Sequence, residues 1–154
     1  MDVQTLAEAV VRKVKQQVET DEWDAMVKTE FENIYVTFYD EVERITHAVD
    51  VSLASFPVNS VSKVWRVQRT PERLSVHFHG KELHFVPITD ASTQPGDRWT
   101  IQVMRHSEEL VVRFFVQQDP RTDTLRLALL AGSVVEWVTE FHLLTLFERE
   151  LLAD

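Results

Sequence analysis

The sequence contains no cysteine, and this absence removes several classes of protein at once. Without thiols there is no disulfide framework, no thiolate nucleophile and no zinc or iron–sulfur site with cysteine ligands. A chain of 154 residues is nevertheless long enough to bury a hydrophobic core. We therefore expect one ordered domain over residues 1–154 that needs no cofactor to fold.

Glycine is also scarce, and its positions exclude the common nucleotide-binding loops. The three glycines are Gly80, Gly96 and Gly132, and none lies in a Gly-x-Gly-x-x-Gly or Gly-x-x-x-x-Gly-Lys arrangement. Such loops need glycine because the backbone must approach a phosphate closely. The sequence has no Gly-x-Ser-x-Gly or His-Glu-x-x-His motif either, which favours a protein that is not an enzyme.

Long apolar runs and an excess of basic charge are missing as well. No run approaches the roughly 18 apolar residues that a membrane span needs, and the first four residues carry an acid instead of the basic charge of an export signal. We therefore expect a cytoplasmic protein with no membrane contact.

The net charge of −9 disfavours nonspecific nucleic-acid binding. It is divided unevenly, with −7 in residues 1–50, +2 in 51–130 and −4 in 131–154.

What the chain does contain is a clear helical period over its first 50 residues. A first apolar stripe predicts a helix of about five turns; its residues are Val3, Leu6, Val10, Val14 and Val18. Asp21 is a candidate N-cap for a second helix, because apolar residues recur at the same spacing from Val27 to Val49. Residues 34–39 also alternate like a strand, which leaves a competing interpretation for that stretch.

From residue 61 the period changes to short alternating runs, which is typical of consecutive antiparallel strands. Six strands are predicted, at 63–69, 74–79, 82–88, 98–105, 110–117 and 124–130, with a further strand or irregular segment at 51–56. Ser133 and Glu136 then form a capping-box pattern after Gly132, which predicts a long C-terminal helix over 131–154. The predicted fold is α+β: two N-terminal helices (1–50), a six-stranded antiparallel meander (51–130) and the C-terminal helix packed on the sheet.

Turn residues predict how neighbouring strands pair. A two-residue turn at Gly80-Lys81 pairs His77 with His84 and His79 with Glu82. The loop over 70–73 places Arg66 opposite His77. The loop over 106–109 pairs Val103 with Val112 and Ile101 with Phe114. The loop at Asp119-Pro120 places Leu125, Leu127 and Leu129 beside Val116, Phe114 and Val112.

These registers gather His77, His79, Glu82 and His84 on one face of the sheet. Cross-strand neighbours lie close enough for two imidazoles to share a metal ion, and three histidines with a carboxylate suit zinc or another divalent transition metal. The competing interpretation is a set of solvated side chains on the open face of an antiparallel sheet.

Arginines form a second candidate site. Arg66, Arg113 and Arg126 fall on the same predicted face as the histidines, where they are suited to bind an anion or single-stranded nucleic acid. The alternative is that they neutralise neighbouring acids and keep the sheet edges soluble.

Apolar residues on the nominally polar face form a third candidate site, an interface made of Met104, Val111, Phe115 and Leu130. Neighbouring apolar side chains on a sheet face are normally covered, either by a helix of the same chain or by a second subunit. The sequence leaves both open.

The leading functional hypothesis is a binding or assembly protein that works through protein–protein contacts or self-association, as a homodimer. A metal-dependent enzyme or sensor and an anion binder are the alternatives.

Overall fold

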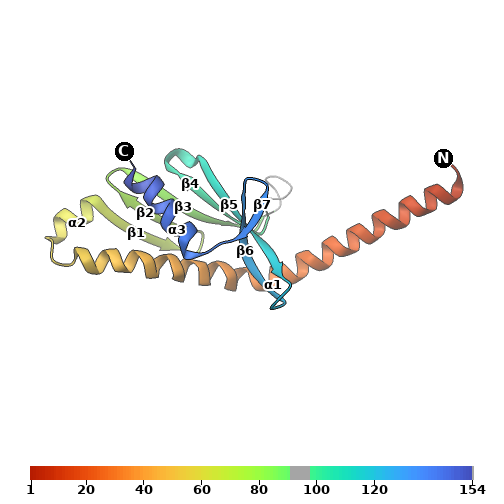
Figure 1. Cartoon of the computed structure of the whole chain (residues 1–154), viewed down its shortest axis with the longest axis horizontal. Coiled ribbons are helices and arrows are strands. Elements are labelled where there is room, and N and C mark those ends of the chain that lie inside the picture. Colours follow the sequence, from red (N-terminus) through yellow and green to blue (C-terminus); the bar gives the residue numbers. More distant parts are fainter. Residues whose placement is uncertain (91–97, 154) are drawn as a thin grey trace.

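The computed structural model describes residues 1–90 and 98–153, and it has an α+β fold (Figure 1). The elements follow in this order: α1 (Val3–Leu53), α2 (Val58–Val64), β1 (Trp65–Thr70), β2 (Arg73–Phe78), β3 (Lys81–Ile88), β4 (Thr100–Arg105), the 3-10 turn η1 (His106–Glu108), β5 (Leu110–Asp119), β6 (Thr124–Ala131), β7 (Val134–Trp137), α3 (Glu140–Phe147) and the π-helical turn η2 (Glu148–Leu152). The described strands form one antiparallel meander in the order β1 to β7.

The N-terminal 50 residues form one helix instead of the two predicted. α1 has 51 residues and, at 1.5 Å per residue, is roughly 75 Å long. Its N-cap is Asp2, whose carboxylate accepts a hydrogen bond from the Thr5 amide at 2.7 Å. Asp21 does not begin a new helix, because no glycine or proline interrupts the chain and the Thr20 hydroxyl donates back to the Gln16 carbonyl at 2.9 Å. The strand interpretation of 34–39 is wrong, since the helix continues to Leu53. For 51–56 the strand alternative is wrong, whereas residues 54–56 are irregular after the end of the helix.

The turn between β2 and β3 differs by one residue from the prediction. The two turn residues are His79 and Gly80, both with positive φ, so that Phe78 pairs with Lys81. His77 consequently lies opposite Glu82, and His84 lies opposite Ser75. The predicted pairing of His77 with His84 is therefore wrong, although Arg66 does lie opposite His77.

The pairing of the later strands follows the prediction more closely. Val103 pairs with Val112 and Ile101 with Phe114, as expected, with a bulge after Val103. On β6 the register is two residues from the predicted one, so that Val116 pairs with Leu127. A shift of two residues leaves every side chain on its predicted face.

The C-terminal region contains a seventh strand in place of the first half of the predicted long helix. Gly132 has a φ of +67° and begins a two-residue turn that pairs Ala131 with Val134, so β7 returns along β6. Glycine at the first turn position suits a type II′ hairpin, and this turn forms where the Ser133–Glu136 capping box was predicted. The helix begins only at Glu140, where Thr139 and His142 form the capping box.

The core lies between one face of the sheet and the second half of α1, with α3 and η2 beside it. Phe38 of α1 meets Phe85 and Phe114 edge to face, with ring centroids 5.4 and 5.6 Å apart. Leu143, Leu146 and Leu151 join the same buried cluster. The Tyr39 hydroxyl donates to the Phe85 carbonyl at 3.2 Å, which satisfies a polar group inside the core, and burial raises the pKa of Tyr39.

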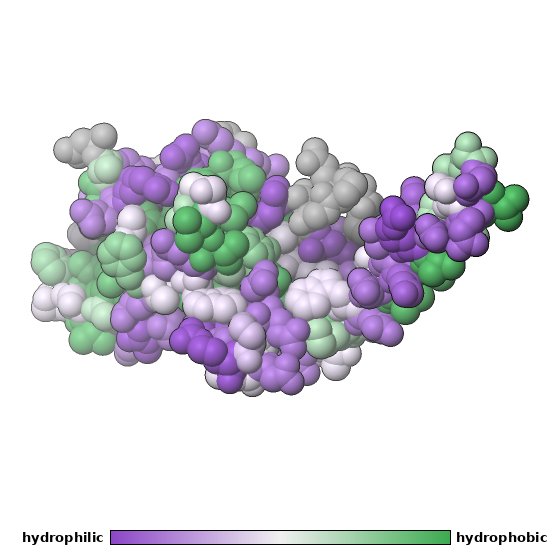
Figure 2. All heavy atoms as spheres, turned by 45° about the vertical axis from the view of Figure 1, so that its right-hand side comes forward, coloured by the Kyte–Doolittle hydropathy of each residue, from purple (hydrophilic) through white to green (hydrophobic). Residues whose placement is uncertain are grey.

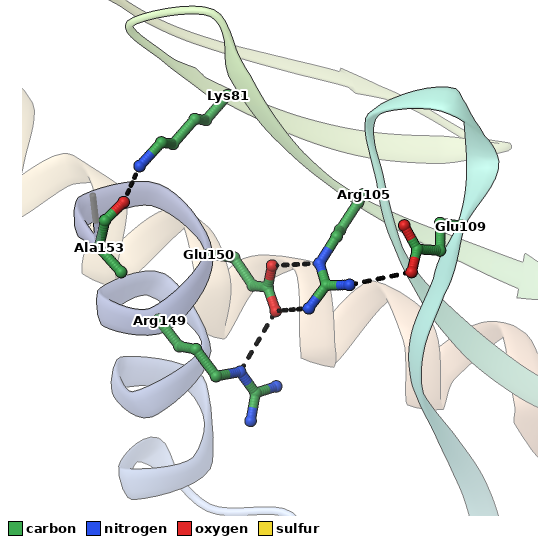
Figure 3. Close-up of polar contacts among 6 residues, drawn as sticks. All are labelled: Lys81, Arg105, Glu109, Arg149, Glu150 and Ala153. Atoms are coloured by element: carbon green, nitrogen blue, oxygen red, sulfur yellow. Dashed lines mark hydrogen bonds and ion pairs between the residues drawn. The ribbon is translucent and has the colours of Figure 1, made fainter.

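Polar contacts hold the C-terminal turn against the sheet (Figure 3). Arg105 of β4 donates two hydrogen bonds to the Glu150 carboxylate, from Nε at 2.6 Å and from Nη2 at 3.0 Å. The Glu150 side chain is only 6% exposed, and the Arg105 guanidinium lowers its pKa. Lys81 donates to the Ala153 carbonyl. The last residues are therefore fixed by a partly buried ion pair as well as by Leu151.

Candidate functional site

The predicted metal residues form a cluster centred on the Glu82 carboxylate. His77 Nδ1 lies 3.1 Å from Glu82 Oε1, and His84 Nε2 lies 3.0 Å from Oε2. His106 of η1, which the sequence did not single out, adds a third imidazole with its Nδ1 3.0 Å from Oε2. Ser75 Oγ lies 2.7 Å from His84 Nδ1 and orients that ring from the other side. His79 lies in the exposed turn with its ring against Phe78, apart from the other three.

The electrostatics of this cluster stabilise the carboxylate. Hydrogen bonds from His106 and His84 lower the pKa of Glu82 to about 2, which keeps it charged at all ordinary pH values. Partial burial lowers the pKa of His77 and thus favours its neutral form. Within residues 1–90 and 98–153, no three His, Asp or Glu side chains are arranged to hold a metal ion. The predicted metal site therefore stays a prediction.

The three candidate arginines have different surroundings. Arg66 is exposed on β1 opposite His77. Arg126 donates to the Asp119 carboxylate at 3.0 Å and its guanidinium lies over the Trp137 ring, 4.7 Å from the centroid. Arg113 is half-buried on β5. Arg126 already has an acidic and an aromatic partner, which matches the alternative that these arginines neutralise neighbouring acids. Anion binding by Arg66, Arg113 and Arg126 stays a prediction.

The predicted apolar interface is only partly exposed. Met104, Val111 and Phe115 are half-buried, whereas Leu130 is 58% exposed on β6. Val111 packs against the hydrophobic core, and Phe115 lines a shallow pocket together with Thr20 and Trp23 of α1. Residues of the same chain therefore cover part of this predicted interface.

A run of exposed apolar side chains lies elsewhere, on the first half of α1. We call residues 3–22 the arm, and Val3, Leu6, Val10, Val14 and Val18 the arm stripe. The arm extends away from the sheet, and hydrophobic residues alternate with hydrophilic ones along it (Figures 1 and 2). Every arm residue except Ala9 is exposed, and the stripe side chains are 49–85% exposed. The sequence predicted this stripe correctly but did not show that the body of the protein leaves it uncovered.

The arm stripe partly continues the face that packs on the sheet. At roughly 100° per residue, the stripe lies about a quarter of a turn around the helix from Val27 and Phe31 but in the same direction as Tyr39. All three of these residues are at most 1% exposed. Trp23 is the first apolar residue of α1 that packs against the core. What changes along α1 is therefore whether the sheet lies beside the apolar face.

The spacing in the arm is that of a helix-pairing surface. Val3, Ala7, Val10, Val14 and Gln17 follow at intervals of four, three, four and three residues, which is a heptad pattern of core positions. Leu6, Val11 and Val18 lie immediately beside this line and widen it. The arm can therefore bury a mainly aliphatic seam, with Gln17 as its polar position, against another helix.

At the opposite end of α1 lies an apolar hollow of about 900 Å³ between α1, the β1–β2 end of the sheet and α3. Ile45, Val49, Trp65, Phe78, Leu144 and Phe147 contribute to its wall. Glu148 and Arg149 also line it, beside these apolar side chains.

Comparison with known proteins identifies no relative: no family model, no curated protein and no solved structure matches this chain. In the described part of the chain, none of the helices combines the length and the apolar character of a membrane span.

Proposed function

We propose that this protein is a non-enzymatic assembly protein, in which a folded body carries a helical arm that associates with another helix. The observation that supports the proposal is the exposed arm stripe. Contiguous exposed apolar surface on a protein marks an interaction site, because leaving it in water is unfavourable.

The arm also needs a partner to be stable as a helix. Isolated helices are marginal in water, and most helical stability in proteins comes from packing of an apolar face. Every arm residue except Ala9 is exposed, so tertiary contacts within the described chain supply little of that stabilisation. Packing the stripe against a second helix would supply it.

The proposal is tested by sedimentation of the whole chain carrying a dye on an introduced cysteine. Asn59→Cys in α2 provides one exposed attachment site, and the absence of native cysteine makes the labelling specific. The labelled protein is measured in buffer and in a cell extract of the source organism. Val14→Asp places a charge in the arm stripe, and Gln16→Asp places the same charge on the opposite side of the arm as a matched control.

We expect the parent chain and Gln16→Asp to sediment faster than an 18.0 kDa monomer in at least one of the two media. Val14→Asp should sediment as the monomer in both, because a carboxylate in an apolar seam loses its hydration without gaining a partner. Monomeric sedimentation of all three proteins in both media would refute the proposal.

Metal binding is a second candidate function, supported by the three imidazoles that meet at Glu82. Calorimetric titration with zinc, repeated on His77→Ala and His84→Ala, tests it. Stoichiometric binding that both substitutions abolish would support a metal site. Weak binding that neither substitution changes would exclude it.

A further inference from the structure

We infer that the apolar hollow at the end of α1 opposite the arm binds a small, uncharged apolar molecule. The inference goes beyond the proposed function, because the hollow lies in the folded body and shares no lining residue with the arm. It is supported by the size of the hollow, by the partners of its polar side chains and by the way its C-terminal wall is fixed.

The hollow has the size and the lining of a small-molecule site. Its volume is about 900 Å³, and ligand pockets in proteins have roughly 300–1,000 Å³ between mainly hydrophobic and aromatic walls. Trp65 and Phe78 line it and meet edge to face, with ring centroids 6.3 Å apart. Phe147 also lines it and meets Phe85 of the core at the same centroid distance. Neighbouring rings therefore hold the aromatic wall in position.

The hydroxyl and indole groups of the lining already have partners within the chain. Thr46 is buried, and its hydroxyl donates to a backbone carbonyl three residues earlier in α1 at 3.1 Å. The Thr145 hydroxyl donates to a carbonyl four residues earlier in α3 at 2.8 Å. The Trp65 indole N–H donates to the Asp50 carboxylate at 2.8 Å. These side chains therefore have no further N–H or O–H to offer a polar ligand.

The charged side chains of the lining stay in contact with water. Among the described residues around the hollow these are Glu148 and Arg149, which are both exposed and carry opposite charges. Arg149 Nε also donates to the Glu150 carboxylate at 3.2 Å. A charged group that enters the hollow would lose hydration without a net opposite charge in the lining to replace it. The lining therefore favours an uncharged molecule over an ion of either sign.

The C-terminal wall of the hollow is the π-helical turn η2, and π turns within helices occur frequently at functional sites. Arg105 fixes this turn through two hydrogen bonds to Glu150, and Lys81 donates to the Ala153 carbonyl just after it (Figure 3). The side chains that make these contacts lie outside the lining of the hollow. The wall therefore keeps its shape without a contribution from a ligand.

The test compares two fluorescent probes that share one ring system. N-phenylnaphthylamine is uncharged, whereas anilinonaphthalene sulfonate carries a sulfonate on the same rings. Each is titrated into the whole chain while its emission is recorded. We expect saturable binding of the uncharged probe at one site per chain, with emission at shorter wavelength. The sulfonate should bind at least about tenfold more weakly, because its charge must enter the hollow together with the rings.

Substitutions at the rim show whether the hollow is the binding site. Leu144 lines the hollow and is 48% exposed, and Leu6 of the arm stripe is 53% exposed. Leu144→Asp should weaken binding of the uncharged probe by at least about tenfold, because it adds a charge to the lining. Leu6→Asp is the matched control and should leave binding unchanged. Thr145→Trp narrows the hollow with a ring instead of a charge and should also weaken binding. Circular dichroism checks that each variant is folded.

Four results would overturn the inference. Absence of saturable binding for both probes would show that the hollow is not a small-molecule site and would leave a protein surface as its occupant. Equal affinity for both probes would exclude selection for uncharged molecules. Binding that persists in folded Leu144→Asp and Thr145→Trp would place the probe elsewhere, and binding lost in Leu6→Asp would place it on the arm. The proposed function is tested separately, by Val14→Asp on the arm.

Discussion

The two halves of α1 have the same kind of sequence but opposite surroundings. Both present apolar residues every three or four positions, yet Val27 and Phe31 are at most 1% exposed, whereas Val10 and Val14 are more than half exposed. The difference arises from what lies beside each half: residues 23–53 pack on the sheet, and the arm extends beyond it (Figure 1). A hydrophobic stripe therefore indicates that a helix needs a partner, without indicating whether that partner is the same chain.

The largest effect should come from deleting a buried ring in the second half of α1. Phe38→Ala removes the edge-to-face contacts with Phe85 and Phe114 and leaves a cavity, which should lower the free energy of unfolding by about 3–5 kcal/mol. Leu6→Ala is the matched variant on the arm and should change the unfolding of the body by less than about 0.5 kcal/mol. Urea denaturation followed by near-ultraviolet circular dichroism measures both. Equal losses would show that the arm is part of the folded core.

A smaller effect should come from the contact that holds the C-terminal turn against the sheet. Glu150→Gln removes the charge that pairs with Arg105 and should cost about 1–2 kcal/mol at neutral pH. The folded-state pKa of Glu150 lies below its ordinary value of 4.5, so this stabilisation is present above that value and is lost as the pH falls through the lowered pKa. Thermal unfolding of the parent and of Glu150→Gln is measured from pH 7 to pH 3, and the difference between their melting temperatures should disappear in acid. A difference that stays constant over this range would contradict the assigned pair.

The smallest effect should come from an exposed ion pair in the second half of α1. Arg44 contacts Glu41 and Glu140 of α3, at 2.6 and 2.8 Å, but its side chain is 58% exposed. Arg44→Ala should leave the melting temperature within about 2 °C of the parent, because solvent-exposed pairs contribute little. A loss comparable with that of Phe38→Ala would mean that charge pairing with α3, rather than apolar burial, distinguishes the two halves of the helix.

The local pattern predicted most of the fold. Alternation over residues 63–130 predicted six of the seven described strands, and the pairings of Arg66 with His77 and Val103 with Val112 are confirmed. The errors occur where two local signals compete. Asp21 resembles an N-cap, but a helix passes through it since nothing breaks the backbone hydrogen bonds. Ser133 and Glu136 resemble a capping box, but Gly132 turns the chain into β7.

The candidate sites were less predictable, because they depend on contacts between distant segments. The one-residue difference at His79 and Gly80 moved His79 out of the histidine cluster, while His106 joined it from a turn more than 20 residues away. The arm stripe was visible as a helical period from the first residues. Its exposure follows from the length of α1 and the extent of the sheet, neither of which a local pattern contains.

The central claim, that another helix covers the arm stripe, is tested most directly by hydrogen exchange in dilute protein, at increasing protein concentration and with added cell extract. We predict that amides in residues 23–53 exchange slowly under every condition, whereas those in residues 3–22 exchange rapidly in dilute protein and become protected as concentration rises or when extract is added. Val14→Asp should abolish that gain. Arm amides that exchange at the same rate under all these conditions, in the parent chain and in Val14→Asp alike, would contradict the claim.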